Sequence, residues 1–133
     1  MARNPKNEPE SYWLPDPASL LPLPAATFHI LLAVAEDDRH GYAIIQDVAA
    51  RTGGELKLSA GTLYRSIQRM LEQGLLTETR ERPSPEEDDE RRRYYRITPY
   101  GTDVARAETR RLTQLVKFAR ESGFAASPLK ARA

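Results

Sequence analysis

The fold is decided by LSAGTLYRSIQRMLEQGLL, residues 58–76, which predicts an amphipathic helix leading directly into a β-hairpin. The apolar side chains recur at the spacing of one helical face, at Leu63, Ile67, Met70 and Leu71. Ser59 stands just before the helix, where its hydroxyl can accept a hydrogen bond from an otherwise unsatisfied backbone N–H. Gly74 follows the last apolar turn, where a left-handed residue usually ends a helix. We therefore expect a helix between Ser59 and Gly74.

The other face of this helix carries small, hydroxyl and basic side chains, a pattern typical of a helix that reads DNA. The candidate contacts are Ser59, Ala60, Thr62, Tyr64, Arg65, Gln68 and Arg69. Backbone N–H groups at a helix N-terminus can approach a phosphate, and arginines farther along can reach base edges or phosphates. For Tyr64, a hydroxyl on a phosphate and a ring packed beside Leu63 are equally good interpretations. Taken alone, the helix favours the alternative of an ordinary solvated face.

The composition indicates one domain with tails, since the chain has 133 residues. It contains no cysteine, which excludes a disulfide framework, a thiolate nucleophile and a cysteine-ligated zinc. No stretch reaches the about 18 to 20 apolar residues of a membrane span, and no apolar signal-peptide core follows the N-terminus. We therefore expect a cytoplasmic protein without a membrane partner.

Charge is distributed unevenly along the chain, although the formal net charge is only +1. The acids cluster at residues 86–90, and Arg91, Arg92 and Arg93 follow immediately. The near-neutral total is weak evidence against a protein that binds nucleic acid through bulk charge, but the distribution matters more than the sum. If the acidic run projects as a loop, the remaining surface is basic.

Four segments follow from the composition. They are a flexible N-terminal arm at 1–21, a winged helix-turn-helix at 22–98, a C-terminal dimerisation helix at 99–122 and a flexible tail at 123–133. The arm holds an aromatic cluster around Trp13. Docking on the protein itself is the more common use of such a cluster, and a ligand pocket that includes Trp13 is the alternative.

Two helices are expected before the central one, at about 24–36 and 40–51. Their expected core faces are Phe28, Leu31, Leu32 and Ala35, and Ile44, Ile45, Val48 and Ala49. His40 is expected to cap or pack rather than to act as a catalytic base, since no oriented partner is recognisable. We also expect Gly41 to lie where another element crosses closely. Residues 55–58 are expected to form a third strand beside the later hairpin.

The hairpin is expected from strands at 75–82 and 92–98, with Tyr95 and Ile97 facing the core. A hairpin with a long loop after a helix-turn-helix is a wing. Arg91, Arg92 and Arg93 stand at its foot, where we expect contacts with phosphates, while the acidic tip points away from DNA because DNA would repel it. A solvated charge run is the alternative for each of these residues.

The last helix, at about 99–121, begins with a strong signal, because Thr98 can cap it and Pro99 suits its first position. An apolar stripe runs along one side of this helix, at Ala105, Leu112, Leu115, Val116 and Ala119. Little of the domain is left for this stripe to pack on, so we expect a symmetric dimer to bury it. Packing on the first helix of the same chain is the alternative for part of it.

The order of these elements indicates a mainly α fold with a small β-hairpin (α+β), a winged helix-turn-helix followed by a dimerisation helix. The chain resembles the PadR family of bacterial transcriptional regulators in four places, with matching order and spacing. They are His40-Gly41-Tyr42, the run from Leu58 to Tyr64, Gly74-Leu75-Leu76, and the run from Arg93 to Gly101. The resemblance covers about residues 22–120, and its motifs are specific only together.

The resemblance implies a homodimer that binds a pseudo-palindromic DNA operator, usually as a repressor, with the single C-terminal helix carrying dimerisation. It also implies that a small planar or phenolic effector lowers DNA affinity from a site near the dimer interface. Two features of this chain depart from the family pattern, namely the aromatic arm and the acidic wing tip.

Two other functions compete with a DNA-binding regulator. The near-neutral charge and the acidic loop favour a winged-helix protein-interaction module that does not bind DNA. An enzyme ranks last, because no nucleophile–base pair, metal cluster or phosphate loop is visible in the sequence. We therefore expect no catalytic residue, no metal and no cofactor.

Overall fold

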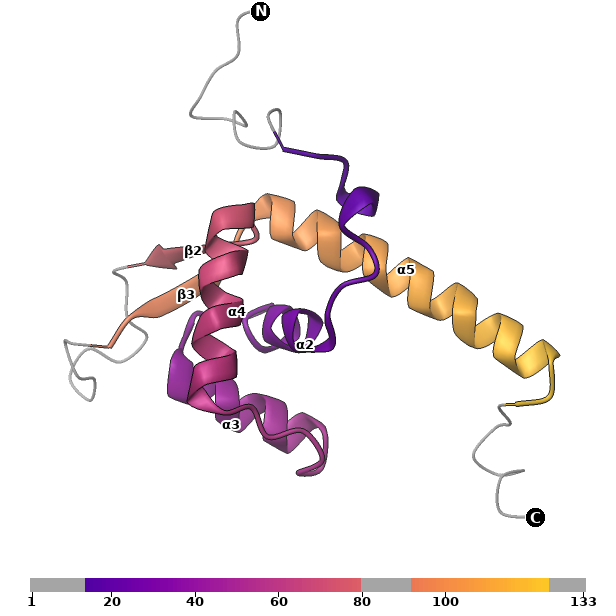
Figure 1. Cartoon of the computed structure of the whole chain (residues 1–133), viewed down its shortest axis with the longest axis horizontal. Coiled ribbons are helices and arrows are strands. Elements are labelled where there is room, and N and C mark those ends of the chain that lie inside the picture. The colour runs from indigo at the N-terminus through magenta and orange to yellow at the C-terminus, as the bar shows by residue number, and fades with distance from the viewer. Residues whose placement is uncertain (1–13, 80–91, 125–133) are drawn as a thin grey trace, which may run out of the picture.

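The computed structural model describes residues 14–79 and 92–124. A short 3₁₀ helix opens this part of the chain, and four α-helices and three short strands follow. They are η1 (Pro17–Leu20), α2 (Ala25–Ala33), β1 (Arg39–His40), α3 (Gly41–Arg51), α4 (Ala60–Gln73), β2 (Leu76–Thr79), β3 (Tyr94–Ile97) and α5 (Pro99–Glu121). Figure 1 shows α4 lying across α2 and α3, with the hairpin on one side and α5 leaving on the other. The expected α+β class with a winged helix-turn-helix is confirmed.

The sheet is antiparallel in the order β1-β3-β2, and its first strand differs from our expectation. Residues 55–58, expected as the third strand, link α3 to α4 without pairing, and their Leu58 side chain is buried in the core. Arg39 and His40 pair with β3 instead. Arg39 is held in place because its Nε donates to the Ala33 carbonyl at 2.6 Å.

The core lies between α2, α3, α4, the first half of α5 and the hairpin. Its fully buried side chains are Ile30, Leu31, Val34, Ile44, Val48, Leu63, Ile67, Met70, Leu75 and Val104. The expected face of α2 was wrong except at Leu31, which is buried. The helix also buries Thr27, Ile30 and Ala33, whereas Phe28 and Leu32 are half-buried and Ala35 is exposed. The helix is apolar nearly all round, so its sequence pattern does not identify the buried side.

The ends of α4 are built as the sequence predicts. Ser59 Oγ accepts a hydrogen bond from the Thr62 N–H at 3.1 Å. Gly74 ends the helix with a left-handed φ of 82°, which a residue with a side chain rarely adopts. These two caps fix where α4 begins and where it ends, and therefore where β2 can start.

The start of α5 is bonded to the turn that follows α4. Thr98 Oγ1 donates to the Gly74 carbonyl at 2.5 Å and accepts a hydrogen bond from the Gly101 N–H at 2.9 Å. The Thr98 N–H also donates to the Leu75 carbonyl at 3.1 Å. One buried threonine thereby caps α5 and joins it to the end of α4.

The segment before α2 packs along α5, although the sequence predicts a flexible arm over 1–21. The Tyr100 hydroxyl donates to the Pro15 carbonyl at 2.7 Å, and the Leu23 N–H donates to Glu108 Oε2 at 3.0 Å. Glu108 is buried, and its carboxylate also accepts from Arg111 at 2.6 Å. The Arg111 hydrogen bond, followed by that from Leu23, lowers the pKa of Glu108 against the opposing effect of burial.

We predict that Gly101→Ala destabilises the fold. A Cβ at this position would overlap the Leu75 carbonyl oxygen, which is backbone and cannot move aside. We expect a loss of about 1–3 kcal/mol, the usual effect of overpacking, measured as a lowered midpoint of thermal unfolding. Gly61→Ala is the matched control, because only the far end of the Arg65 side chain lies near that Cβ. Equal midpoints for both variants would contradict the tight junction.

We predict that Glu108→Gln lowers stability at neutral pH and less so in acid. A carboxylate with a lowered pKa contributes stability above its unfolded-state pKa, and this contribution is lost as the pH falls through the folded-state pKa. Denaturant unfolding from pH 7 to about pH 3 should show the difference between the two proteins shrinking. Asp103→Asn should have little effect at any pH, since Asp103 is 54% exposed and its ion pair with Arg106 spans 3.8 Å.

Candidate nucleic-acid interface

The exposed face of α4 holds most of the residues predicted to contact DNA. Arg65, Gln68 and Arg69 are exposed, and Thr62 is half-buried. Arg65 and Arg69 are four residues apart, so they share one side of the helix. The Ser59 hydroxyl is already used as the helix cap, whereas the neighbouring Ala60 leaves the helix entrance uncrowded. Arginine donors along an open helix face suit base edges and phosphates.

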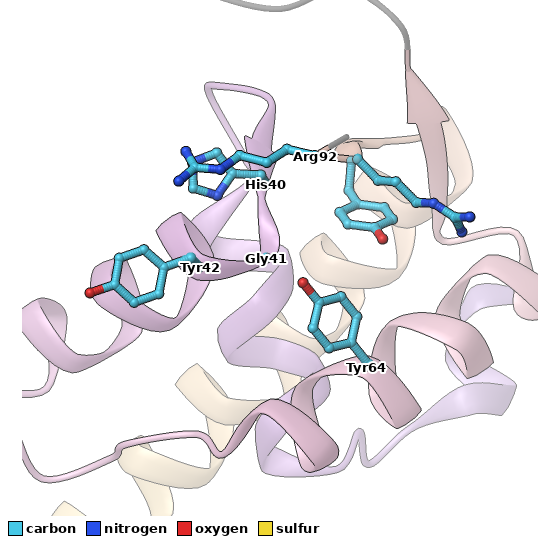
Figure 2. A pocket seen from close by; sticks show the side chains of 7 residues that line it. His40, Gly41, Tyr42, Tyr64 and Arg92 are labelled. Carbon is cyan, nitrogen blue, oxygen red and sulfur yellow. The ribbon is translucent and has the colours of Figure 1, made fainter. Parts of the chain in front are cut away.

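A cavity of about 460 Å³ opens beside this face, where α3, α4 and β3 meet (Figure 2). Its walls are His40, Gly41, Tyr42, Tyr64, Arg92, Arg93 and Tyr95. The cavity therefore joins Tyr64 of α4, the helix predicted to read DNA, to Arg92 and Arg93 of the wing. Two further lining residues, His40 and Tyr42, were not assigned to DNA binding from the sequence.

His40 connects three elements. Its Nδ1 accepts a hydrogen bond from the Ala43 N–H at 3.1 Å and so caps α3, as predicted. Its ring packs edge-on against Tyr94, with the ring centroids 5.3 Å apart. Its Nε2 lies 3.0 Å from Arg92 Nη1, and Figure 2 shows the Arg92 side chain running to the His40 ring.

Tyr64 crosses closest to α3 at Gly41, as predicted for a close approach. A Cβ on Gly41 would overlap the Tyr64 hydroxyl oxygen. Tyr64 is nevertheless 49% exposed and Tyr42 is 59% exposed. Figure 2 places the two rings on opposite sides of Gly41. Tyr64 therefore packs its ring and still presents part of itself to solvent, so the two sequence interpretations are compatible.

The cavity is lined by donors of hydrogen bonds and by positive charge. No carboxylate is among its lining residues in the described part of the chain. Among the described residues, Glu78 lies near the cavity, because it pairs with Arg93 at 3.4 Å. Burial, and then the charge of Glu78, raise the pKa of Tyr95, so this hydroxyl remains a donor at neutral pH. The cavity is chemically suited to an anion.

Some predicted residues are not brought into the cavity. Arg65, Gln68 and Arg69 lie on α4 outside it, and Gln68 Nε2 bonds to Glu72 at 3.3 Å. Arg91, Trp13 and the acidic wing tip lie outside the described residues. Tyr42 was not predicted from the sequence to contact DNA. The motif His40-Gly41-Tyr42 was the available signal, because a helix start carrying a histidine and a tyrosine can face a ligand.

Four of the five residues predicted for dimerisation lie on the second half of α5, which extends past the other helices (Figure 1). Leu115 is 52% and Val116 44% exposed, and Phe118 beside them is 53% exposed. Leu112 and Ala119 are half-buried. Ala105 differs from them, because it packs against the core of its own chain.

Two further properties concern only residues 14–79 and 92–124. No group of three His, Cys, Asp or Glu side chains there is placed to hold a metal ion. No helix there combines the length and the apolar character needed to span a bilayer.

Comparison with known proteins links this geometry to a family. The model of the family described as "Transcriptional regulator PadR-like family" matches residues 30–107. The protein called "Uncharacterized protein X" of Lysinibacillus sphaericus is 35% identical over 72 residues, which are 54% of this chain. The match spans 63% of the length of that relative.

Solved structures share the fold. A transcriptional regulator from Clostridium thermocellum is 24% identical with a TM-score of 0.62, covering 72% of this chain and 87% of its own. A PadR family transcription regulator from Clostridium difficile is 23% identical with a TM-score of 0.61, covering 74% and 97% of the two chains. At these identities the likeness concerns the fold alone.

Proposed function

The chain belongs to the PadR-like family of transcriptional regulators, and we propose that it represses transcription by binding a pseudo-palindromic operator as a homodimer. It acts by binding rather than by catalysis, in the cytoplasm. Its DNA contacts are Thr62, Tyr64, Arg65, Gln68 and Arg69 of α4, the N-terminal entrance at Ser59 and Ala60, and Arg91, Arg92 and Arg93 of the wing.

The observation that supports DNA binding is the exposed pair Arg65 and Arg69 beside the donor-lined cavity. In a helix-turn-helix, the second helix enters the major groove with its N-terminal residues near the bases. Arginine is the commonest reader of guanine there, because two of its donors match the O6 and N7 acceptors. The open entrance at Ala60 lets the backbone come close to the groove edge.

The second half of α5 supports the homodimer. Leu115, Val116 and Phe118 are each about half exposed on a helix that extends past the body of the domain. A second copy related by two-fold symmetry would bury the stripe of Leu112, Leu115, Val116 and Ala119 against itself. Two reading helices roughly 34 Å apart would then meet successive major grooves on one side of the DNA.

An effector site fits between α2 and α5. A groove of about 370 Å³ is walled there by apolar side chains, including Leu31, Leu32 and Ala105, with Arg106 and Arg110 at its edge. An apolar slot with a few polar groups is the usual form of a small-molecule site. A planar or phenolic molecule bound there would touch both the domain and the dimerisation helix, and we propose that it releases the DNA.

We predict that Arg65→Ala and Arg69→Ala each weaken binding to the DNA upstream of the gene about tenfold or more, because each removes a base or phosphate contact. Both side chains are exposed, so the midpoint of thermal unfolding should not fall. Fluorescence anisotropy with labelled upstream and scrambled DNA at two salt concentrations measures the affinity. The same titration with added phenolic acids tests the release.

Arg51→Ala is the matched control, because Arg51 is an exposed arginine on the last turn of α3, away from the cavity. Unchanged affinity in both α4 variants would overturn α4 as the reading helix. Failure of the unaltered protein to bind either DNA at low salt would instead favour the protein-interaction module, since phosphate contacts strengthen as salt falls.

We predict that Leu115→Glu dissociates the dimer, because burial of the carboxylate in an apolar interface is strongly unfavourable. Sedimentation velocity should show the mass of one chain, with the helix content by circular dichroism close to that of the unaltered protein. Gln114→Glu is the control, since it adds the same charge at the neighbouring exposed position. A dimer that persists in Leu115→Glu would contradict this use of α5.

A further inference from the structure

The Arg65 side chain is folded back along α4 toward the start of the helix. Its Nη2 donates a long hydrogen bond of 3.5 Å to Thr62 Oγ1, one turn earlier. Its Nη1 lies over Gly61, where a Cβ would stand 3.3 Å from that nitrogen. These two contacts place the guanidinium over the first turn of a helix that begins at Ala60. The exposed arginine is therefore held at a defined place on the helix surface.

Gly61 has no backbone reason to be a glycine. It lies inside α4 and does not have a positive φ, and glycine within a helix is less favourable than alanine. Among the described residues, and apart from the backbone of the helix and the adjacent residues, a Cβ there would meet only Arg65 Nη1. An arginine also gains nothing from the positive end of a helix dipole. Both features cost stability in the free protein, which indicates that they serve binding.

The Arg65 guanidinium keeps a complete pair of adjacent donors in this position. Arginine has five N–H groups in a planar fork, and the bond to Thr62 uses one of the two on Nη2. Whichever of these is used, the other still points alongside an N–H of Nη1 or of Nε. Guanine presents two acceptors, O6 and N7, that such a pair matches in the major groove. A phosphate carries no sequence information, whereas reading a base needs a fork held at a fixed place and angle.

Arg69 provides the contrast. It is exposed one turn later on the same side of α4. Within residues 14–79 and 92–124 it makes no hydrogen bond or ion pair that would orient it. The N-terminal part of a reading helix is the part that contacts base edges, and Arg65 is the arginine that reaches back to it. Arg69 is better suited to a phosphate, which a mobile cation can bind.

We propose that Gly61 and Thr62 form a seat for Arg65, and that the seated guanidinium reads one guanine per half-site. This inference rests on the proposed function and assigns different tasks to the two arginines of α4. Arg65 specifies the sequence, and Arg69 holds the DNA backbone. Gly61 is a positioning residue, because the missing side chain acts on DNA only through the place that it leaves for Arg65.

The test compares double variants. Gly61→Ala adds one methyl group to the seat, so the guanidinium has to shift by a few tenths of an ångström or leave. Its effect on affinity for the upstream DNA is measured by anisotropy in the unaltered protein, beside Arg65→Ala, and beside Arg69→Ala as the matched control. The same proteins are titrated on DNAs in which each guanine of the half-site is replaced singly by 7-deazaguanine. This base lacks the N7 acceptor and leaves every phosphate in place.

We expect Gly61→Ala to weaken binding about threefold or more, because it misaligns a charged hydrogen bond. Its midpoint of thermal unfolding should be unchanged or higher, since alanine favours the helix. The weakening should persist beside Arg69→Ala and disappear beside Arg65→Ala, as for two residues that act through one contact.

One 7-deazaguanine position per half-site should weaken the unaltered protein roughly tenfold and the Arg65→Ala protein little further. The Arg69→Ala protein should respond to the 7-deazaguanine series as the unaltered protein does. Its binding should also depend less on salt, by about one unit in the slope of the logarithmic plot.

Three results would overturn the seat while the regulator function stands. Gly61→Ala could bind as the unaltered protein does, which would show that the position of Arg65 does not depend on the glycine. Equal weakening by Gly61→Ala with and without Arg65 would show that the added methyl group meets the DNA directly. The absence of any 7-deazaguanine position that separates Arg65→Ala from the unaltered protein would assign Arg65 to a phosphate. If the unaltered protein binds upstream and scrambled DNA equally, the proposed function fails first and the seat fails with it.

Discussion

The rest of the structure depends on the hydrogen bonds of Thr98. Its side chain donates to the carbonyl that ends α4 and accepts from the third residue of α5, and the absence of a side chain at Gly101 lets the two backbones meet there. The direction of α5 is therefore set by the end of the helix that carries the proposed DNA contacts. In a two-fold dimer through α5, the spacing of the two reading helices follows from the angle fixed at this junction. A small rotation of α5 about this junction would change that spacing. A molecule bound in the groove between α2 and α5, as proposed above, would be well placed to cause such a rotation.

A second connection, centred on His40, ties the wing to the helix-turn-helix. The residue ends β1, caps α3, packs on Tyr94 and reaches Arg92. The sheet therefore meets the helices through a polar side chain, in addition to the apolar core beneath it. A domain with this connection can present α4 and the foot of the wing to DNA as one rigid unit. Less ordering is then needed on binding, which leaves more of the contact energy as affinity.

The sequence predicts elements that carry their own local signals and fails where the deciding contact is distant. α4 and the start of α5 were predicted with their caps, because Ser59, Gly74, Thr98 and Pro99 act within a few residues of themselves. The third strand was misplaced because pairing of residues 39–40 depends on β3, more than fifty residues later. Pro15 and Leu23 are held along α5 by hydrogen bonds with Tyr100 and Glu108, 85 residues later in the chain. The prolines of this segment carry no local signal of those distant contacts. Likewise, the cap that His40 forms on α3 was predicted correctly from the sequence. Its contact with Arg92 could not be predicted, because the two residues meet only in the folded chain.

The net charge of +1 does not oppose DNA binding once the placement of the acids is considered. Asp38 pairs with Arg96, Asp47 with Arg51, and Glu108 with Arg111. Among the described residues, no ion pair involves Arg65 or Arg69, and Glu72 near its end is the acid of α4. Acids therefore neutralise bases away from the reading face and leave that face positive. A protein arranged in this way gains little from non-specific attraction to the duplex, so its affinity must come mainly from a few placed contacts. This is the arrangement in which the few contacts proposed for α4 and the wing have the greatest effect on where the protein binds.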